Sequence, residues 1–252
     1  MCPRASRSLF TIFFMKSIAL IPARSGSQRV KDKNIYLLEG HPLLAYAIRS
    51  AIDSNIFNAV HVCTDSALYS DIATKYGALC PILRPNETAS SSSPDSSWIQ
   101  WFFSVHPEYK EFDFAAILRP TSPFRTPATI NRAFKTFLES SSDTLRAVRP
   151  VTEHPGKMWI EQSGCIIPLI PLSLAGVPFH SNQTCELFPC FIQDASLEIF
   201  TIKNFLSTNL ITGSSVLPFV NHDFEGFDIN TPADIKEMHQ LIDAKIAFPY
   251  RF

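Results

Sequence analysis

The sequence lacks the two common glycine patterns that hold nucleotide phosphates. Only 8 of its 252 residues are glycine, and neither GxxxxGKS/T nor GxGxxG occurs. HExxH and GxSxG are also absent, and the histidines are scattered along the chain. These absences exclude a Walker-type loop and a dinucleotide fingerprint, and they give no support to a zinc-protease or serine-hydrolase site.

An excess of charge of one sign is missing as well. The formal net charge is −1, with 46% hydrophobic and 18% charged residues, which is typical of a globular protein. Such a chain has no global field to recruit nucleic acid or a membrane surface, and no stretch approaches the ~20 apolar residues of a membrane span. Any anion site must therefore come from a local cluster of cations, which favours a small-molecule ligand.

Metal-ligand cysteine spacing is the next absence. None of the six cysteines forms a CxxC pair, and Cys63 lies inside an apolar run where a buried reduced thiol is usual. We therefore predict a cytoplasmic protein. Residues 1–14 are basic and acid-free, with an apolar end but no cleavage site. We interpret residues 1–15 as a disordered extension or a mis-assigned start, with one domain over residues 16–252.

Strand-like and helix-like segments alternate along that domain, which predicts an α/β fold with a mostly parallel central sheet. A polar corner follows a strand and precedes a helix at least four times, so these corners are expected at one edge of the sheet. Strands are predicted at 18–21, 59–64, 78–85, 114–120, 144–151 and 216–220, and helices at 42–54, 67–76, 98–109, from 127 and from 232. Residues 86–97 are predicted to be a mobile polar loop whose last residues, 95–97, cap the next helix.

Residues 152–192 break this alternation. The segment is rich in proline, glycine and cysteine and carries many apolar side chains, Trp159 and Phe188 among them. A long, apolar, irregular segment suggests an excursion that packs on another subunit. We predict a protruding dimerisation arm and a homodimer.

The stretch Lys16–Asn34 carries the strongest functional signal. A short buried strand ends at Pro22 and opens into a loop that contains Gly26 and four cationic side chains: Arg24, Arg29, Lys31 and Lys33. Gly26 lets the backbone curl so that its N–H groups can face phosphate oxygens. The pattern suits a polyphosphate, although a solvated basic loop is the simpler alternative.

The exact residues of this loop resemble a known family. Residues 21–34 read IPARSGSQRVKDKN, close to the IPARxGSKRxxxKN signature of the cytidylyltransferases that activate sialic acid and related acidic sugars. Further motifs follow in the family's order over roughly residues 16–240: RP at 84–85, LRPTSPFR at 118–125, EHPGKMW at 153–159 and FDINTPAD at 227–234. The resemblance implies a three-layer nucleotidyltransferase fold, Rossmann-like and GT-A-like, and transfer of CMP from CTP to an acidic 2-keto sugar.

The resemblance also implies roles for individual residues. The catalytic group is Arg24, Lys33 and Asp228, and Mg²⁺ (or Mn²⁺) is expected at Asp228 and Asn230, which point to the same face of an extended segment. CTP is expected at Arg24, Ser25, Gly26, Gln28, Lys33, Asn34 and Arg84. The acidic sugar is expected at Arg119, Ser122, Lys157, Gln193 and Asp194, with His154 beside Lys157 in the same motif.

Three positions depart from the family's pattern. Gln28 replaces a common lysine, Arg119 replaces the glutamine of sialic-acid enzymes, and Asn230 replaces a second metal-binding aspartate. Two alternatives therefore stay open: a nucleotidyltransferase for another sugar or sugar phosphate, and a non-catalytic nucleotide-binding homologue. Without the resemblance, Asp228 and Asn230 would simply precede a helix.

Overall fold

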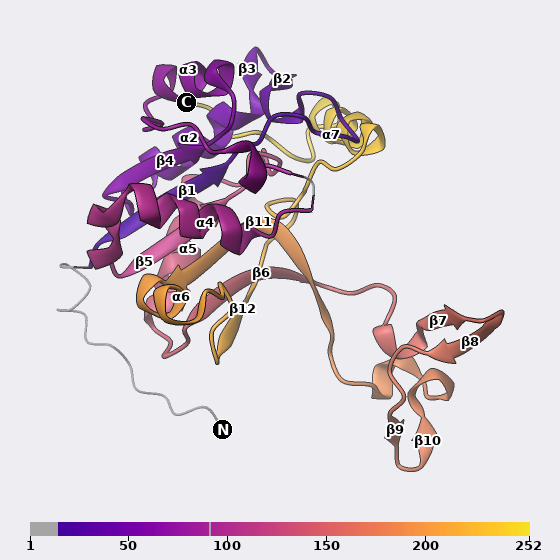
Figure 1. The fold of residues 1–252 in the computed structure, drawn as a ribbon. Coiled ribbons are helices and arrows are strands. Elements are labelled where there is room, and N and C mark those ends of the chain that lie inside the picture. Colours follow the sequence, from indigo (N-terminus) through magenta and orange to yellow (C-terminus); the bar gives the residue numbers. More distant parts are fainter. Residues whose placement is uncertain (1–14, 91) are drawn as a thin grey trace. The chain divides into compact units, whose positions relative to one another are not determined.

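A six-stranded sheet forms the centre of the larger of two compact units (Figure 1). The structure is a computed structural model that describes residues 15–90 and 92–252. The strand order is β12 (Val216–Val220), β6 (Thr144–Pro150), β11 (Phe191–Thr201), β5 (Phe114–Leu118), β1 (Ser17–Pro22) and β4 (Ala59–Cys63). β1 pairs in parallel with both β4 and β5, whereas β11 runs antiparallel to β5. The predicted mostly parallel sheet, with residues 114–118 in a central strand, is confirmed.

Helices cover both faces of this sheet. Alternate residues of β1 point to opposite faces, so β1 contributes apolar side chains to a cluster on each side. Ala19 and Ile21 pack in one cluster with α2 (Leu43–Asp53), α3 (Ala67–Lys75) and α5 (Pro127–Leu138). Ile18 and Leu20 pack in the other cluster with α4 (Asp95–Val105) and α6 (Ile202–Thr208). α7 (Pro232–Asp243) packs through Met238 in a third cluster that includes Leu38 of β2 (Leu37–Leu38), a short strand paired with β3 (His41–Pro42). The result is a three-layer α/β unit.

Local capping chemistry sets several helix starts where the sequence predicts them. Ser66 Oγ accepts from the N–H of Tyr69, and Thr126 and Thr231 each form a capping box ahead of a proline at the first helical position. Gly77 follows α3 with φ +94°, a conformation that glycine adopts without strain. These boundaries are local, so short-range rules predict them.

Several predicted elements differ from the structure. The helix predicted over 98–109 ends at Val105, and a separate 3₁₀ helix covers Pro107–Glu111. Residues 78–85 do not form a strand: Leu79 alone makes a parallel bridge, to His61, since the prolines at 81 and 85 have no N–H to continue the ladder. Residues 95–97 form the first turn of α4 instead of capping it, because Pro94 takes the cap position. Pro42 caps α2 and does not start it.

The smaller unit comprises Val148–Gln193. It contains a hairpin of β7 (Trp159–Gln162) and β8 (Cys165–Pro168) and a shorter one of β9 (Ser173–Leu174) and β10 (Val177–Pro178). Each turn consists of two residues with positive φ, the second a glycine, which matches the twist of a hairpin. The segment 152–192, predicted to be an excursion, contains these two hairpins and three short 3₁₀ helices, Pro155–Lys157, Phe179–Ser181 and Thr184–Glu186.

No helix in the described part of the chain is long and apolar enough to cross a membrane. The predicted extension over residues 1–15 lies outside the described residues, apart from Met15.

Candidate functional site

The loop after β1, residues 23–30, is called the phosphate loop below. The parallel register places Pro22 beside Cys63, and the N–H of Ala23 donates to the carbonyl of Cys63 at 3.1 Å. The loop leaves the sheet there and turns at Gly26, whose φ is +70°. A side chain at that φ would be strained, so the turn favours glycine.

Asp65, directly after β4, holds the phosphate loop at Ser25. One carboxylate oxygen accepts from the N–H of Ser25 at 2.7 Å, and the other accepts from Ser25 Oγ at 2.6 Å. Ser25 is predicted to contact CTP, but in this structure both of its donors are directed to Asp65. No motif in the sequence assigns this role to Asp65. The signal available in the sequence was a carboxylate two residues after the strand that pairs with β1.

Three other predicted CTP residues lie in or beside this loop. Asn34 is buried, and its Nδ2 donates to the carbonyl of Arg24 at 3.0 Å. Arg24 is half-buried, with Nη1 at 3.5 Å from the carbonyl of Ala89. Gln28 is exposed and donates to the carbonyl of Gly26 at 3.3 Å. Asn34 therefore supports the loop from inside, while Arg24 and Gln28 are the more exposed side chains of the three.

Lys33 joins the N-terminal motif to the motif around residue 228. Its Nζ donates to the carbonyl of Ile229 at 2.5 Å and lies 3.4 Å from Asn230 Oδ1. Burial lowers the pKa of Lys33 below its ordinary value of 10.5, while the nearby Asp228 carboxylate opposes the shift. The predicted catalytic pair Lys33 and Asp228 is brought together although 195 residues separate them in the chain.

Asp228 and Asn230 lie side by side, as their spacing predicts. Asn230 Nδ2 donates to Asp228 Oδ2 at 2.5 Å, while Asp228 Oδ1 is shielded from solvent without a hydrogen-bond partner among the described residues. An orphaned carboxylate oxygen is a suitable ligand for Mg²⁺. No group of three or more histidine, cysteine or acidic residues in the described part of the chain can hold a metal. These residues thus fit an ion that takes most of its ligands from phosphates and water.

Arg84 lies in the polar region after β4. It is 5% exposed, donates through Nε to Thr88 Oγ1 at 3.2 Å and through Nη2 to the Thr88 carbonyl, and lies over the ring of Trp98. Burial lowers its pKa from the ordinary arginine value. The guanidinium is therefore held rigidly, with its orientation set by Thr88 and Trp98.

Arg119, predicted to pair with the sugar carboxylate, is already paired within the protein. Its Nη2 lies 2.6 Å from Asp95 and 3.2 Å from Glu198, which is almost fully buried and also pairs with Arg146 at 2.9 Å. The two acids oppose the effect of burial and raise the pKa of Arg119. A ligand carboxylate at Arg119 would bond to its remaining N–H donors or replace one of these acids.

The corner after β5 also contains a buried arginine that the sequence analysis did not assign. Arg125 is 1% exposed, and its Nη1 donates to the carbonyls of Arg119 (3.1 Å) and Ser196. Ser122 is 2% exposed, and its Oγ has no partner among the described residues. Asp194 accepts from the N–H and hydroxyl of Ser196 and from Asn221 Nδ2 at 2.8 Å. Of the predicted sugar residues in this unit, Ser122 is thus the one with a hydroxyl left to bond, and Asp194 is engaged in structure.

The other predicted sugar residues, Lys157 and Gln193, belong to the smaller unit. Lys157 Nζ donates to the carbonyls of His180 (3.0 Å) and Asn182. His154 is buried, accepts from the N–H of Gly156 at 2.9 Å, and lies 3.2 Å from Cys190 Sγ. Both motif residues therefore brace the fold of their own unit.

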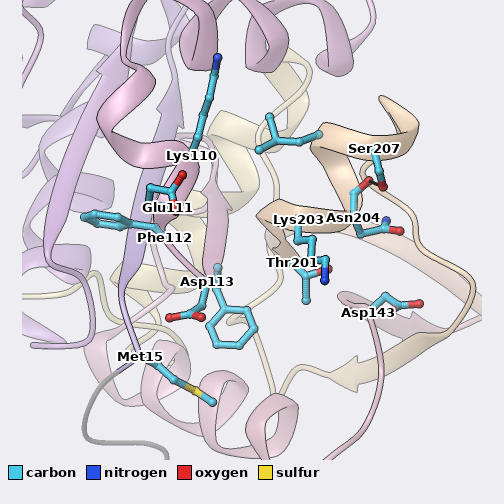
Figure 2. Close-up of a pocket in the computed structure, with 12 residues that line it drawn as sticks. Met15, Lys110, Glu111, Phe112, Asp113, Asp143, Thr201, Lys203, Asn204 and Ser207 are labelled. Atoms are coloured by element: carbon cyan, nitrogen blue, oxygen red, sulfur yellow. Dashed lines mark hydrogen bonds between the residues drawn. The ribbon is translucent and has the colours of Figure 1, made fainter.

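A pocket of about 910 Å³ lies at the opposite edge of the sheet (Figure 2). It is lined by the residues just before β1 and within and before β5, by Asp143 and by α6, and it contains none of the predicted site residues. Since parallel α/β sheets bind ligands at the carboxyl ends of their strands, the phosphate-loop edge is the candidate site.

Comparisons with known proteins identify the family of the chain. A family model described as cytidylyltransferase matches residues 18–157. The chain is 31% identical to CMP-N,N'-diacetyllegionaminic acid synthase of Legionella pneumophila, over 91% of this chain and 97% of that protein. It is 43% identical to N-acylneuraminate cytidylyltransferase of Escherichia coli over 88% of this chain, which spans 51% of that relative's length.

Solved structures support the same fold. CMP:2-keto-3-deoxy-manno-octonic acid synthetase, solved with CTP, superposes with a TM-score of 0.63 at 13% identity, over 91% of this chain and 99% of that one. A 4-diphosphocytidyl-2C-methyl-D-erythritol synthase from Anaerococcus prevotii gives a TM-score of 0.60 at 10% identity, with coverage of 91% and 99%. Family model, relatives and fold agree, and the chain belongs to the cytidylyltransferase family.

Proposed function

We propose that this protein transfers CMP from CTP to the anomeric hydroxyl of an acidic 2-keto sugar of the sialic, legionaminic or pseudaminic type and releases pyrophosphate, as a step in surface glycan biosynthesis. The single observation that carries the proposal is the contact of Lys33 with Ile229 and Asn230, beside Asp228. This contact supports the proposal because it brings a cation that follows the phosphate loop into the segment that contains Asp228, whose Oδ1 has no hydrogen-bond partner among the described residues. The names of the similar proteins support the sugar class.

In the proposed reaction, the sugar oxygen forms a bond to the α-phosphorus while the bond from that phosphorus to the bridging oxygen of pyrophosphate breaks. The sugar hydroxyl passes its proton to Asp228 or to a water that Asp228 orients, and negative charge develops on the pyrophosphate. Arg24 and Lys33 are the cations placed to neutralise that charge, Arg24 with a planar fork and Lys33 with a point charge. The triphosphate would take Lys33 Nζ from its contact with the Ile229 carbonyl.

We further propose that Asp228 holds Mg²⁺, or Mn²⁺, through its unpaired Oδ1, with Asn230 beside it. The bound ion would neutralise phosphate charge and lower the pKa of a bound hydroxyl. Asn230 orients the Asp228 carboxylate by donating to Oδ2. Oδ1 is the oxygen left to bind the ion.

For the sugar, Ser122 is the proposed contact at the corner after β5, because its hydroxyl is shielded and has no partner in the described chain. Arg119 would reach the sugar carboxylate by exchanging Asp95, which is more exposed than Glu198. Lys157 and Gln193 remain proposed sugar contacts on the smaller unit.

We also propose that the smaller unit binds a second copy of the chain, giving a homodimer. Apolar side chains are exposed on both strands of its main hairpin; Trp159 is 44% and Ile166 is 61% exposed. Exposed apolar surface of this kind is typical of an interface. The five described cysteines are free, and we place the protein in the cytoplasm.

The test is pyrophosphate release with CTP, Mg²⁺ and a panel of sialic, legionaminic and pseudaminic acids, with neutral sugars and sugar phosphates as controls. Among these acceptors, only an acidic 2-keto sugar is expected to support pyrophosphate release. Tight CTP binding without turnover on any sugar would favour a non-catalytic homologue. Turnover on a sugar phosphate would show that the substrate is a sugar phosphate and not an acidic 2-keto sugar.

A further inference from the structure

We propose that Asp65 is a positioning residue that holds the phosphate loop in the conformation that binds the triphosphate of CTP. The inference rests on the proposed function and adds to it a residue outside the predicted site. Asp65 would act through Ser25, without touching the nucleotide.

The sheet register brings the two residues together. β1 and β4 stay paired as far as Pro22 and Cys63, and the N–H of Ala23 extends the ladder by one bond. Beyond it, the Asp65 carboxylate continues the connection: one oxygen takes the backbone N–H of Ser25 at 2.7 Å and the other takes the hydroxyl at 2.6 Å. Hydrogen bonds to an ionised acceptor are the strong kind. Because Ser25 immediately precedes Gly26, these two bonds set the direction in which the chain enters its positive-φ turn.

The charge of Asp65 makes the proposal unusually easy to test. A carboxylate next to a polyphosphate site repels the ligand, so removing the charge alone would strengthen CTP binding. Both Asp65 oxygens accept hydrogen bonds from Ser25. If these bonds position the loop, removal of Asp65 should weaken CTP binding. Loss of Asp65 frees the loop, and CTP must then order it on binding, which weakens affinity. The sign of the change in affinity separates the two roles.

The experiment measures the dissociation constant of CTP by calorimetry, without sugar, for wild type, Asp65→Ala, Asp65→Asn and Ser25→Ala. Asp65→Ala is expected to weaken CTP binding about tenfold or more, since two charge-assisted bonds are lost. Asp65→Asn keeps an acceptor for the Ser25 N–H and is expected to recover part of the loss. Ser25→Ala removes one bond and is expected to weaken binding about threefold. Asp71→Asn, an exposed acid on α3, is the matched control for charge removal.

Kinetics and coupling give the second readout. The KM for CTP should rise in Asp65→Ala while the KM for the sugar stays within about twofold, a split that a general loss of stability would not produce. The double variant should bind CTP no more weakly than Asp65→Ala alone, because both changes remove the same connection.

Unchanged or tighter CTP binding in Asp65→Ala would overturn the inference and leave the proposed function standing. If that variant does not fold, Ser25→Ala decides, and wild-type affinity there would overturn the inference. Absence of CTP binding by the wild-type protein would instead refute the proposed function itself.

Discussion

Replacement of Lys33 by methionine is expected to remove most transfer activity and to lower stability. The ammonium group donates to the carbonyl of buried Ile229 at 2.5 Å, and methionine leaves that carbonyl unpaired. A buried polar group without a partner costs about 1–3 kcal/mol, which is the expected loss in the free energy of unfolding. Removal of one group that stabilises charge in the transition state lowers kcat by about 10²–10³-fold, the range expected here.

The pH dependence adds a sharper criterion. Burial lowers the pKa of Lys33 from its ordinary 10.5, and lysine is cationic only below its pKa. Activity that needs the cation is therefore lost as the pH rises through this lowered pKa, so the alkaline limb begins below pH 10.5. In Lys33→Arg, which keeps a charge to high pH, the limb should move upward.

The assay is pyrophosphate release at saturating Mg²⁺, followed as kcat/KM for CTP from pH 7 to pH 10.5, with urea unfolding of the ligand-free variants. Lys75→Met, on the exposed end of α3, is the matched control and should behave as wild type. A Lys33→Met enzyme within about threefold of wild type in kcat/KM would refute the reasoning, since a transition-state contact should cost far more. An alkaline limb at the same pH in Lys33→Arg would refute the assignment of that limb to Lys33.

Three further predictions concern single residues. Asn230→Asp places a second carboxylate against Asp228. The added charge should lower the Mg²⁺ concentration for half-maximal activity, and repulsion between the two carboxylates should lower the melting temperature without metal. An unchanged metal dependence would show that residue 230 is not part of the metal site. Arg119→Gln leaves buried Glu198 with one arginine partner and should lower the free energy of unfolding by about 1–3 kcal/mol in urea, and a loss under about 0.5 kcal/mol would show that the pair is not stabilising. Burial lowers the pKa of His61 from 6.5 to about 4, so the unfolded chain binds a proton at His61 before the folded chain does, and stability should fall as the pH drops from 6.5 to 4. His61→Phe should reduce the pH dependence of the free energy of unfolding over this range, measured by urea denaturation. An unaltered pH dependence would count against the role of His61.

Sequence patterns predicted most of the fold because the interactions involved are short-range. The Thr126-Pro127 and Thr231-Pro232 pairs start helices by bonds within one turn, so neighbouring residues suffice to place them. The continuous apolar run of residues 18–21 predicted a buried strand, and β1 contributes residues to both core clusters. The prediction over 78–85 was wrong because an apolar run specifies no ladder partner, and its prolines cannot supply the N–H groups that a strand needs.

By itself, the sequence determined the family motifs, the cationic loop after β1 and most of the order of strands and helices. Only the tertiary structure decided which of those side chains remain available to a ligand. The fold brought Asp65 to Ser25 across 40 residues and Lys33 to Ile229 across 196, and it paired Arg119 with Asp95 and Glu198. Such contacts depend on sheet register and on the packing of distant segments, which no local pattern encodes. The physical reason is that a hydrogen bond or ion pair needs its partner within about 3–4 Å, and only the folded chain sets that distance.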